Sequence, residues 1–306
     1  MLRAEQLSRT FDQTVAVDHI TFDVPTGSVF ALLGPNGAGK TTTVRMLTCL
    51  IRPTAGTAQF DGLDVTREAD AMQIRAMVGL LPESPGLYER LSAYKNLDFH
   101  ARLYGVAKAR RASNIERLLR LLGVWDRRDD AVSTFSKGMR QKIAIARALV
   151  HDPKYLFLDE PTASLDPEAS RTVREFILGL KAEGRTVFLN THNLDEAERV
   201  ATRIGILHHR LMAVGTPDEL RARMGPPTVV AEVVGPAAPF VGAVDGAGLS
   251  GATAEGSLLR VASPNAAAAA PRLAEALVRA GAQVVRIEQE RPSLESIYIK
   301  LMGGSP

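Results

Sequence analysis

Residues 34–42, GPNGAGKTT, combine closely spaced glycines with one lysine and two threonines. The order Gly34, Gly39, Lys40, Thr41 fits the phosphate-loop pattern, in which backbone N–H groups wrap around a phosphate and the next helix points its positive end at the anion. The lysine reaches the terminal phosphates, and the threonine hydroxyl is offered to Mg²⁺. A glycine-rich turn without a ligand is the competing interpretation, which an expected strand before the motif and helix after it disfavour. The expected phosphate contacts are Gly34, Asn36, Gly37, Ala38, Gly39, Lys40, Thr41 and Thr42.

Two adjacent carboxylates, Asp159 and Glu160, end the apolar run YLFLDE. An aspartate at the end of a buried strand can hold Mg²⁺, and the next carboxylate can polarise a water that attacks a phosphate. Carboxylates at strand ends are commonly just solvated turn residues, so this interpretation depends on the phosphate loop in the same sheet. We expect Asp159 to bind the metal and Glu160 to act as general base.

Three further residues are candidates for contact with the same ligand. His192 follows the apolar run VFLNT, from where its side chain could reach a terminal phosphate, although a lone histidine at a strand end is more often structural. Phe11 and Ala16 could pack on an adenine ring, and core packing accounts for them equally well. The remaining histidines and the single Cys49 are expected to be structural.

These motifs need a sheet to bring them together. Residues 20–24, ITFDV, alternate as a half-buried strand does, and predict a β-rich start. The runs KYLFLDE and RTVFLNTH are short and continuously apolar, which is typical of parallel strands buried on both faces. Helical stretches separate these runs, so the sequence predicts an α/β fold with a βαβ core.

A helical region is expected at about 84–135. There the apolar period becomes that of a helix, Ser113 and Glu116 are spaced as a capping box at a helix start, and Gly123 marks its end.

The composition changes near residue 225. Thr216 and Pro217 predict another helix start, and the chain beyond it is rich in Gly, Ala, Pro and Val. We expect one domain at 1–225 and a small α+β domain at 226–306. Its expected strands lie near 228–234, 257–262 and 283–289, and its expected helices near 265–280 and 293–302.

Charge and hydropathy favour a cytoplasmic protein. The net charge is only +3, which gives no electrostatic footprint for nucleic acid. The apolar runs are shorter than the roughly 20 residues needed to cross a bilayer. The N-terminus lacks the layout of a secretory signal, and a single cysteine forms no internal disulfide.

Taken in order, GPNGAGKTT, FSKGM, YLFLDEPTASLD and NTH resemble the ATP-binding cassette of ABC transporters over roughly residues 1–220. The resemblance implies ATP and Mg²⁺ as cofactors and ATP hydrolysis as the activity. It implies a phosphate-loop fold with a mixed central sheet, an N-terminal antiparallel β part and the inserted helical subdomain. In that family the FSKGM segment is the signature motif, which contacts the γ-phosphate of an ATP held by a second cassette.

The resemblance therefore implies a head-to-tail homodimer around two ATPs. Ser136, Gly138 and Met139 would contact the partner's nucleotide, and residues 164–166, which begin with Ser164, would cross the interface. One helix N-terminus can complete an anion site on a second copy only from the opposite face, which explains why the chain has a second helix start of this kind.

Three positions depart from the family's usual motifs. Lys137 and Met139 stand where glycine and glutamine are common in the signature. Glu83, in GLLPESPGLYERLS, stands where the Q-loop glutamine is expected. A glutamate can still offer oxygen to Mg²⁺, so Glu83 is an expected metal ligand with Thr41 and Asp159, but it adds a negative charge beside the phosphates.

The signature, Glu83 and the tail RPSLESIYIKLMG look like those of the ATPase subunits of bacterial ABC-2 type exporters of drugs, lipids, polysaccharides and sodium. This resemblance implies a separate integral membrane permease and a location on the inner face of the membrane. Pro85, Leu87, Tyr88 and Leu91 would receive the permease, although packing within the subdomain explains them about as well. Pro292 and Ser293 would open the last helix. The alternatives are an importer ATPase and a soluble ABC-type ATPase that acts on nucleic acid or the ribosome.

Overall fold

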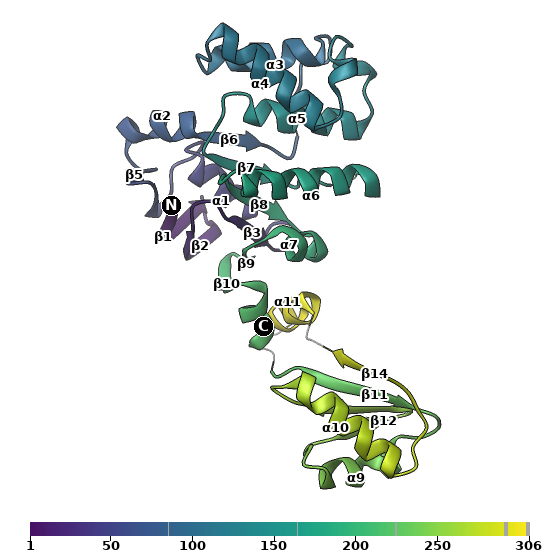
Figure 1. Cartoon of the computed structure of the whole chain (residues 1–306). Coiled ribbons are helices and arrows are strands. Elements are labelled where there is room, and N and C mark those ends of the chain that lie inside the picture. Colours follow the sequence, from purple (N-terminus) through teal and green to yellow (C-terminus); the bar gives the residue numbers. More distant parts are fainter. Residues whose placement is uncertain (85, 164, 224, 291–292, 304–306) are drawn as a thin grey trace. The chain divides into compact units, whose positions relative to one another are not determined.

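A computed structural model of the chain describes residues 1–84, 86–163, 165–223, 225–290 and 293–303. The chain forms two compact units, Met1–Pro217 and Asp218–Pro306 (Figure 1). The division falls at the start of the helix that the sequence analysis had placed at the end of the first domain. Pro85, Ser164 and Pro292, to which the sequence analysis assigned roles, lie outside the described residues.

The first unit begins with an antiparallel sheet. Its strands alternate buried and exposed residues, as in β2, where Ile20, Phe22 and Val24 are buried while Thr21 and Asp23 face solvent. Strand β2 begins at Thr14, so it is longer than the expected 20–24. The strand order is β2-β1-β4-β5, with bounds Leu2–Phe11 for β1, Thr14–Val24 for β2, Ala55–Phe60 for β4 and Leu63–Asp64 for β5.

A second sheet of the first unit is parallel except at one edge. Its order is β10-β9-β3-β8-β7-β6, and only the edge strand β10 is antiparallel to its neighbour. The bounds are Val29–Leu33 for β3, Val78–Leu81 for β6, Tyr155–Asp159 for β7, Thr186–Thr191 for β8, Arg203–His208 for β9 and Arg210–Gly215 for β10.

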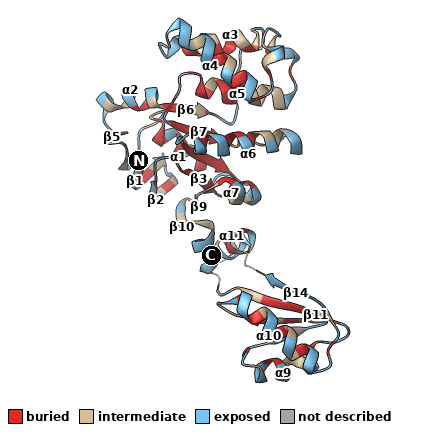
Figure 2. Cartoon of the chain, viewed as in Figure 1, coloured by how far each residue is buried: buried red, intermediate tan, exposed pale blue. Residues whose placement is uncertain are grey.

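Every residue of β3, β7 and β8 is buried, as expected for strands covered on both faces (Figure 2). The rings of Phe30 and Phe157 stack on opposite sides of Phe188, at centroid distances of 5.3 and 5.1 Å. Because the carboxyl ends of parallel strands meet at one edge, the loops after β3, β6, β7 and β8 gather there. The predicted α/β fold with its mixed sheet is confirmed.

Helices connect the strands of this unit. α1 follows β3, and the other connecting helices run between later strands. Their bounds are Lys40–Leu47 for α1, Glu68–Met77 for α2, Pro167–Ala182 for α6 and Leu194–Val200 for α7. Three more helices form a group at one end of the unit (Figure 1), with bounds Ala93–Leu103 for α3, Lys108–Leu121 for α4 and Lys137–Leu149 for α5.

The predicted helix start at Ser113 is wrong. α4 begins at Lys108, and the Ser113 hydroxyl donates to the Arg110 carbonyl oxygen (3.2 Å) within the helix. Alanine, lysine and arginine are strong helix formers, so the KARRA segment extends the helix upstream without a side-chain cap at Ala107. The predicted end is correct, because the helix stops just before Gly123, whose φ is 66°.

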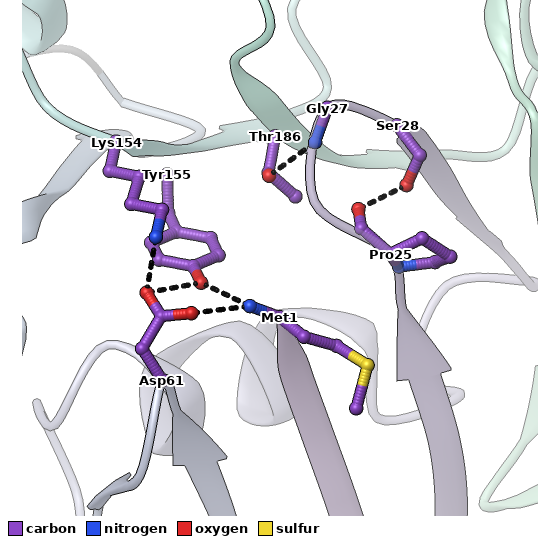
Figure 3. Close-up of polar contacts among 8 residues, drawn as sticks. All are labelled: Met1, Pro25, Gly27, Ser28, Asp61, Lys154, Tyr155 and Thr186. Atoms are coloured by element: carbon purple, nitrogen blue, oxygen red, sulfur yellow. Dashed lines mark hydrogen bonds and ion pairs between the residues drawn. The ribbon is translucent and has the colours of Figure 1, made fainter.

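A polar junction joins the two sheets at the amino ends of β7 and β8 (Figure 3). Asp61, in the turn between β4 and β5, accepts hydrogen bonds from Lys154 Nζ (2.6 Å) and Tyr155 OH (2.9 Å). The Met1 amine lies 2.5 Å from the same carboxylate. Nearby, the Thr186 hydroxyl oxygen accepts the N–H of Gly27 (3.0 Å). These contacts hold the start of β7, whose other end carries Asp159.

The second unit is a small α+β domain. Its antiparallel sheet has the order β12-β13-β11-β14, with β11 at Thr228–Val233, β12 at Thr253–Glu255, β13 at Leu258–Ala262 and β14 at Val284–Glu290. Leu273 and Leu277 of α10 are buried against this sheet. The sequence analysis anticipated three of the strands but not β12 or α9. The helices of this part are α8 at Pro217–Ala222, α9 at Val241–Gly246, α10 at Ala266–Arg279 and α11 at Leu294–Gly303.

Two further observations concern the helices. The Ser293 hydroxyl accepts the N–H of Ser296 (3.1 Å) and so caps the start of α11. Across the described ranges, each helix is either too short or too polar to cross a bilayer.

Candidate active site

The phosphate loop connects the end of β3 to the start of α1. Gly37 and Gly39 have φ values of 84° and 98°, in the left-handed region that favours glycine. A Cβ on Gly39 would lie 2.3 Å from the Ala16 carbonyl oxygen, and one on Gly34 would lie 2.4 Å from that of Leu207. Larger residues would therefore push the loop off the neighbouring strands. The first-turn N–H groups of α1 have no acceptor within the helix, so they are available to an anion.

A cavity of about 330 Å³ opens beside this loop. Ala16 lines it, as does every expected phosphate contact except Gly34, which points its carbonyl oxygen at Lys40 instead. Phe11 does not line it. That residue ends β1 with 41% of its surface exposed, and the Arg9 guanidinium lies 4.5 Å from its ring centroid. The lining residues are Ala16, Pro35, Asn36, Gly37, Ala38, Gly39, Lys40, Thr41, Thr42, Glu83, Asp159 and Glu160.

Lys40 is the cation of this cavity wall. Its side chain is buried, and Nζ donates to the carbonyl oxygens of Gly34 (2.7 Å) and Pro35 (3.1 Å). Burial lowers the pKa of Lys40, while the negative charges of Glu160, Asp159 and Glu83 act in the opposite direction. An ammonium group held in this way is poised to exchange weak carbonyl partners for a bound anion.

Asp159 is fixed by two hydrogen bonds. Its Oδ2 accepts from Thr41 Oγ1 (3.0 Å), and its Oδ1 accepts from Asn190 Nδ2 (2.8 Å). The aspartate and Asn190 are both buried, so the carboxylate has little freedom to turn. A hydroxyl and a carboxylate oxygen side by side at the cavity wall are donors of the type that Mg²⁺ prefers.

Asn190 was not predicted as a site residue from the sequence. Its signal was the one amide side chain inside the apolar run VFLNT, but the strand to which that amide would bond is not visible in the sequence.

Glu160 projects from a strained backbone position. Its φ is 50°, in the left-handed region, which costs a non-glycine residue about 1–2 kcal/mol. Its N–H donates to the Asn190 carbonyl oxygen (2.8 Å), which holds the turn in place. His192 Nδ1 lies 2.9 Å from Glu160 Oε1. The carboxylate therefore reaches the cavity while the more exposed histidine contacts it from outside.

The signature residues lie away from this cavity. The Ser136 hydroxyl caps α5 by accepting the N–H of Met139 (3.2 Å). Gly138 faces the start of α6, where an added Cβ would lie 3.4 Å from the Cβ of Ala169. None of Ser136, Gly138 and Met139 is among the residues that line the cavity. Lys137 is exposed, as is usual for a long lysine side chain.

Known protein families match both units of the chain, and known proteins match most of its length. The family described as ABC transporter matches residues 17–163, and the ATP-binding protein DrrA1-3-like C-terminal domain matches residues 215–302. The daunorubicin resistance ATP-binding protein DrrA3 of Streptomyces coeruleorubidus is 35% identical over 291 residues, which are 94% of this chain and 91% of that protein. The linearmycin resistance ATP-binding protein LnrL of Bacillus subtilis (strain 168) is 33% identical over 231 residues, which are 75% of this chain and 74% of that protein.

Solved structures match the cassette. An ATP-binding subunit of an ABC transporter superposes with a TM-score of 0.67 at 34% identity, covering 73% of this chain and 93% of its own. A dimeric ATP-binding cassette bound to ADP and phosphate shares the fold, with a TM-score of 0.65 at 22% identity, over 71% of this chain and 98% of its own. The chain therefore belongs to the ABC transporter family as an ATP-binding and ATP-hydrolysing subunit that carries a DrrA1-3-like C-terminal domain.

Proposed function

We propose that two copies of this chain hydrolyse Mg²⁺-bound ATP between them and so power export through a separate ABC-2 type permease on the inner face of the cell membrane. One observation carries the proposal. The cavity brings Lys40, Thr41, Asp159 and Glu160 together, whereas the signature at the start of α5 lies outside it. The chain thus carries the phosphate-loop part of a phosphate site on one surface and the signature part on another.

The hydrolytic roles follow from chemistry and position. The loop N–H groups and Lys40 bind the phosphates, and Thr41 and Asp159 would hold Mg²⁺, which neutralises phosphate charge when bound. Glu160 takes a proton from the attacking water. His192 holds that carboxylate and can contact the terminal phosphate. Positioning and electrostatics supply most of the rate enhancement in such phosphoryl transfer.

The second copy would complete the site from the opposite side. The positive end of α5, with Ser136 and Gly138, suits a phosphate that this copy does not itself hold. A symmetric pair of chains would use the same two surfaces twice and enclose two nucleotides. Asp166, the described end of the segment expected at the interface, caps α6 by accepting the Ala169 N–H (2.8 Å). This cap fixes where α6 begins, immediately after that segment.

An apolar patch on the group of helices α3–α5 suits a hydrophobic partner. Tyr88, Phe99 and Leu103 are 48%, 39% and 67% exposed. The ring of Tyr88 packs edge-on against Phe99 at 5.2 Å, and Phe99 and Leu103 are one helical turn apart on α3. Leu87 and Leu91 are half-buried beside it, as subdomain packing expects. We assign this patch to the permease contact, because contiguous exposed apolar side chains commonly mark a protein–protein or membrane contact.

Affinity capture from detergent-extracted membranes tests the permease contact. The tagged chain should capture a polytopic membrane protein, and Leu103→Glu should reduce the captured amount by at least tenfold because it places a charge in the apolar contact. Met72→Glu is the matched control, since Met72 is a 72% exposed apolar residue on α2, away from the patch. Equal capture by the Leu103 and Met72 variants would contradict the assignment.

A further inference from the structure

The walls of the cavity carry more negative than positive charge. Among its lining residues, Lys40 is the cation, whereas Glu83, Asp159 and Glu160 are carboxylates. The ligand that the site is proposed to take, ATP, is itself a polyanion. A surplus of wall carboxylates opposes such a ligand unless a cation enters with it.

The three carboxylates differ in the direct contacts that they make. Asp159 accepts two hydrogen bonds, from Thr41 and Asn190, and Glu160 is in contact with His192. Glu83 is exposed just after β6, and among the described residues it makes no hydrogen bond or ion pair. Its charge acts on Lys40 across the cavity without touching it. Among the described residues, Glu83 is therefore the carboxylate of this cavity that has no direct contact with a protein donor.

Glu83 stands where the Q-loop of the ABC transporter cassette usually has a glutamine, so a carboxylate replaces a neutral amide at this position of the chain. An amide can accept from a metal-bound water or donate to a phosphate oxygen, so it tolerates nucleotide with or without metal. An ionised carboxylate donates nothing, repels a bare triphosphate and attracts a divalent cation. The same substitution therefore changes the binding free energy of the two nucleotide forms in opposite directions.

We propose that Glu83 makes this site discriminate between metal-bound and metal-free ATP, so that nucleotide is captured as its Mg²⁺ complex. The proposal rests on the function proposed above and adds the selection of the nucleotide form that enters. When one unit charge lies in the wall of a binding site, it changes the binding constant of a charged ligand in that site by about tenfold. Glu83 acts here as a specificity-determining residue for the ligand rather than as a proton-transfer group.

Calorimetric binding of the non-hydrolysable analogue AMP-PNP to the full chain tests the proposal, with Mg²⁺ in excess and with EDTA. The quantity compared is the Kd in EDTA divided by the Kd in Mg²⁺, measured at low ionic strength because salt screens the effect. In Glu83→Gln this ratio should fall about tenfold, mainly through tighter binding in EDTA. Glu83→Asp is the matched control, because it keeps the charge and should keep the ratio within about threefold of the wild-type value.

The outcomes separate this proposal from the proposed function. A ratio in Glu83→Gln within twofold of the wild-type ratio would overturn the role of Glu83 while leaving ATP binding intact. A fall of the ratio in Glu83→Asp as large as in Glu83→Gln would overturn it too, since shape rather than charge would then matter. Loss of binding by the wild type in Mg²⁺, by contrast, would reject the nucleotide site itself. Because Glu83 is exposed, both variants should fold, which circular dichroism checks.

Discussion

The three carboxylates of the cavity have the same chemistry but different partners. Asp159 is fixed by Thr41 and Asn190, Glu160 is held against His192, and Glu83 has no hydrogen bond or ion pair with the part of the chain that the structure describes. Residue type and position at a strand end were enough to predict Asp159 and Glu160 as candidates. They did not predict Asn190, because its contact depends on β8 lying beside β7. That neighbourhood is a tertiary fact with no local signal.

Glu160→Gln should separate chemistry from binding. The amide cannot accept the proton of the attacking water, so kcat for ATP hydrolysis should fall by about 10²–10⁴-fold. Binding should be retained, with a Kd for ATP in Mg²⁺ no weaker than that of the wild type, because removing one negative charge from the cavity wall favours a polyanionic ligand. Phosphate release and calorimetric binding measure the two quantities.

Glu175→Gln provides the control for that substitution. Glu175 is an exposed glutamate of α6 that pairs with Arg171 away from the cavity, so its variant should hydrolyse ATP as the wild type does. If Glu160→Gln kept a tenth or more of the wild-type kcat, another group would have to be the base.

For helices and strands, the apolar period of the sequence predicted the middle of each element better than its ends. The apolar runs that became β7 and β8 were recognisable because both faces of these strands are covered. The start of α4 was not, because a helix-forming Ala/Lys/Arg segment continued the helix beyond its apolar stripe. Strand β12, of three residues, has too few positions to show a period. The ends of helices and strands therefore depend on helix and strand propensity and on tertiary packing. The apolar pattern alone reveals neither of these.

The junction at Asp61 makes the seating of β7 dependent on pH. Burial acts to raise the pKa of Asp61, but hydrogen bonds from Lys154, the Met1 amine and Tyr155 outweigh it, and the pKa falls to about 2. Since this lies below the ordinary value of 3.8, the stability contributed by the carboxylate is complete above pH 4 and is lost as the pH falls toward 2.

Asp61→Asn should therefore destabilise the first unit at pH 7 by about 1 kcal/mol, allowing for solvent screening, with the deficit shrinking between pH 4 and pH 2. Urea unfolding followed at several pH values measures the deficit. Asp23→Asn, a substitution of an exposed aspartate near Arg3, should show a much smaller and flatter difference. A deficit for Asp61→Asn that stays constant down to pH 2 would contradict the assigned role of the ionised carboxylate.

For the whole molecule, we propose that no single chain completes an ATP site. The signature motif and the phosphate loop were both readable from the sequence, as was the resemblance that implies their pairing. The structure adds that Ser136 and Gly138 do not line the cavity of their own chain. Gly138 has ordinary space for a side chain and no left-handed φ, so its substitution should leave the fold intact. Variants at Lys40 and at Gly138 should therefore each disable one part of the ATP site without unfolding the chain.

Mixing two inactive variants tests whether the site is shared between two copies. Lys40→Ala should be inactive because it cannot hold phosphate, and Gly138→Asp should be inactive because it adds a negative charge to the helix start that is proposed to bind the partner's phosphate. When equal amounts are mixed, half of the pairs are mixed pairs with one intact site out of two, so ATPase activity should recover to about a quarter of the wild-type value. Activity in the mixture no higher than the average of the two variants alone would contradict a site shared between two copies.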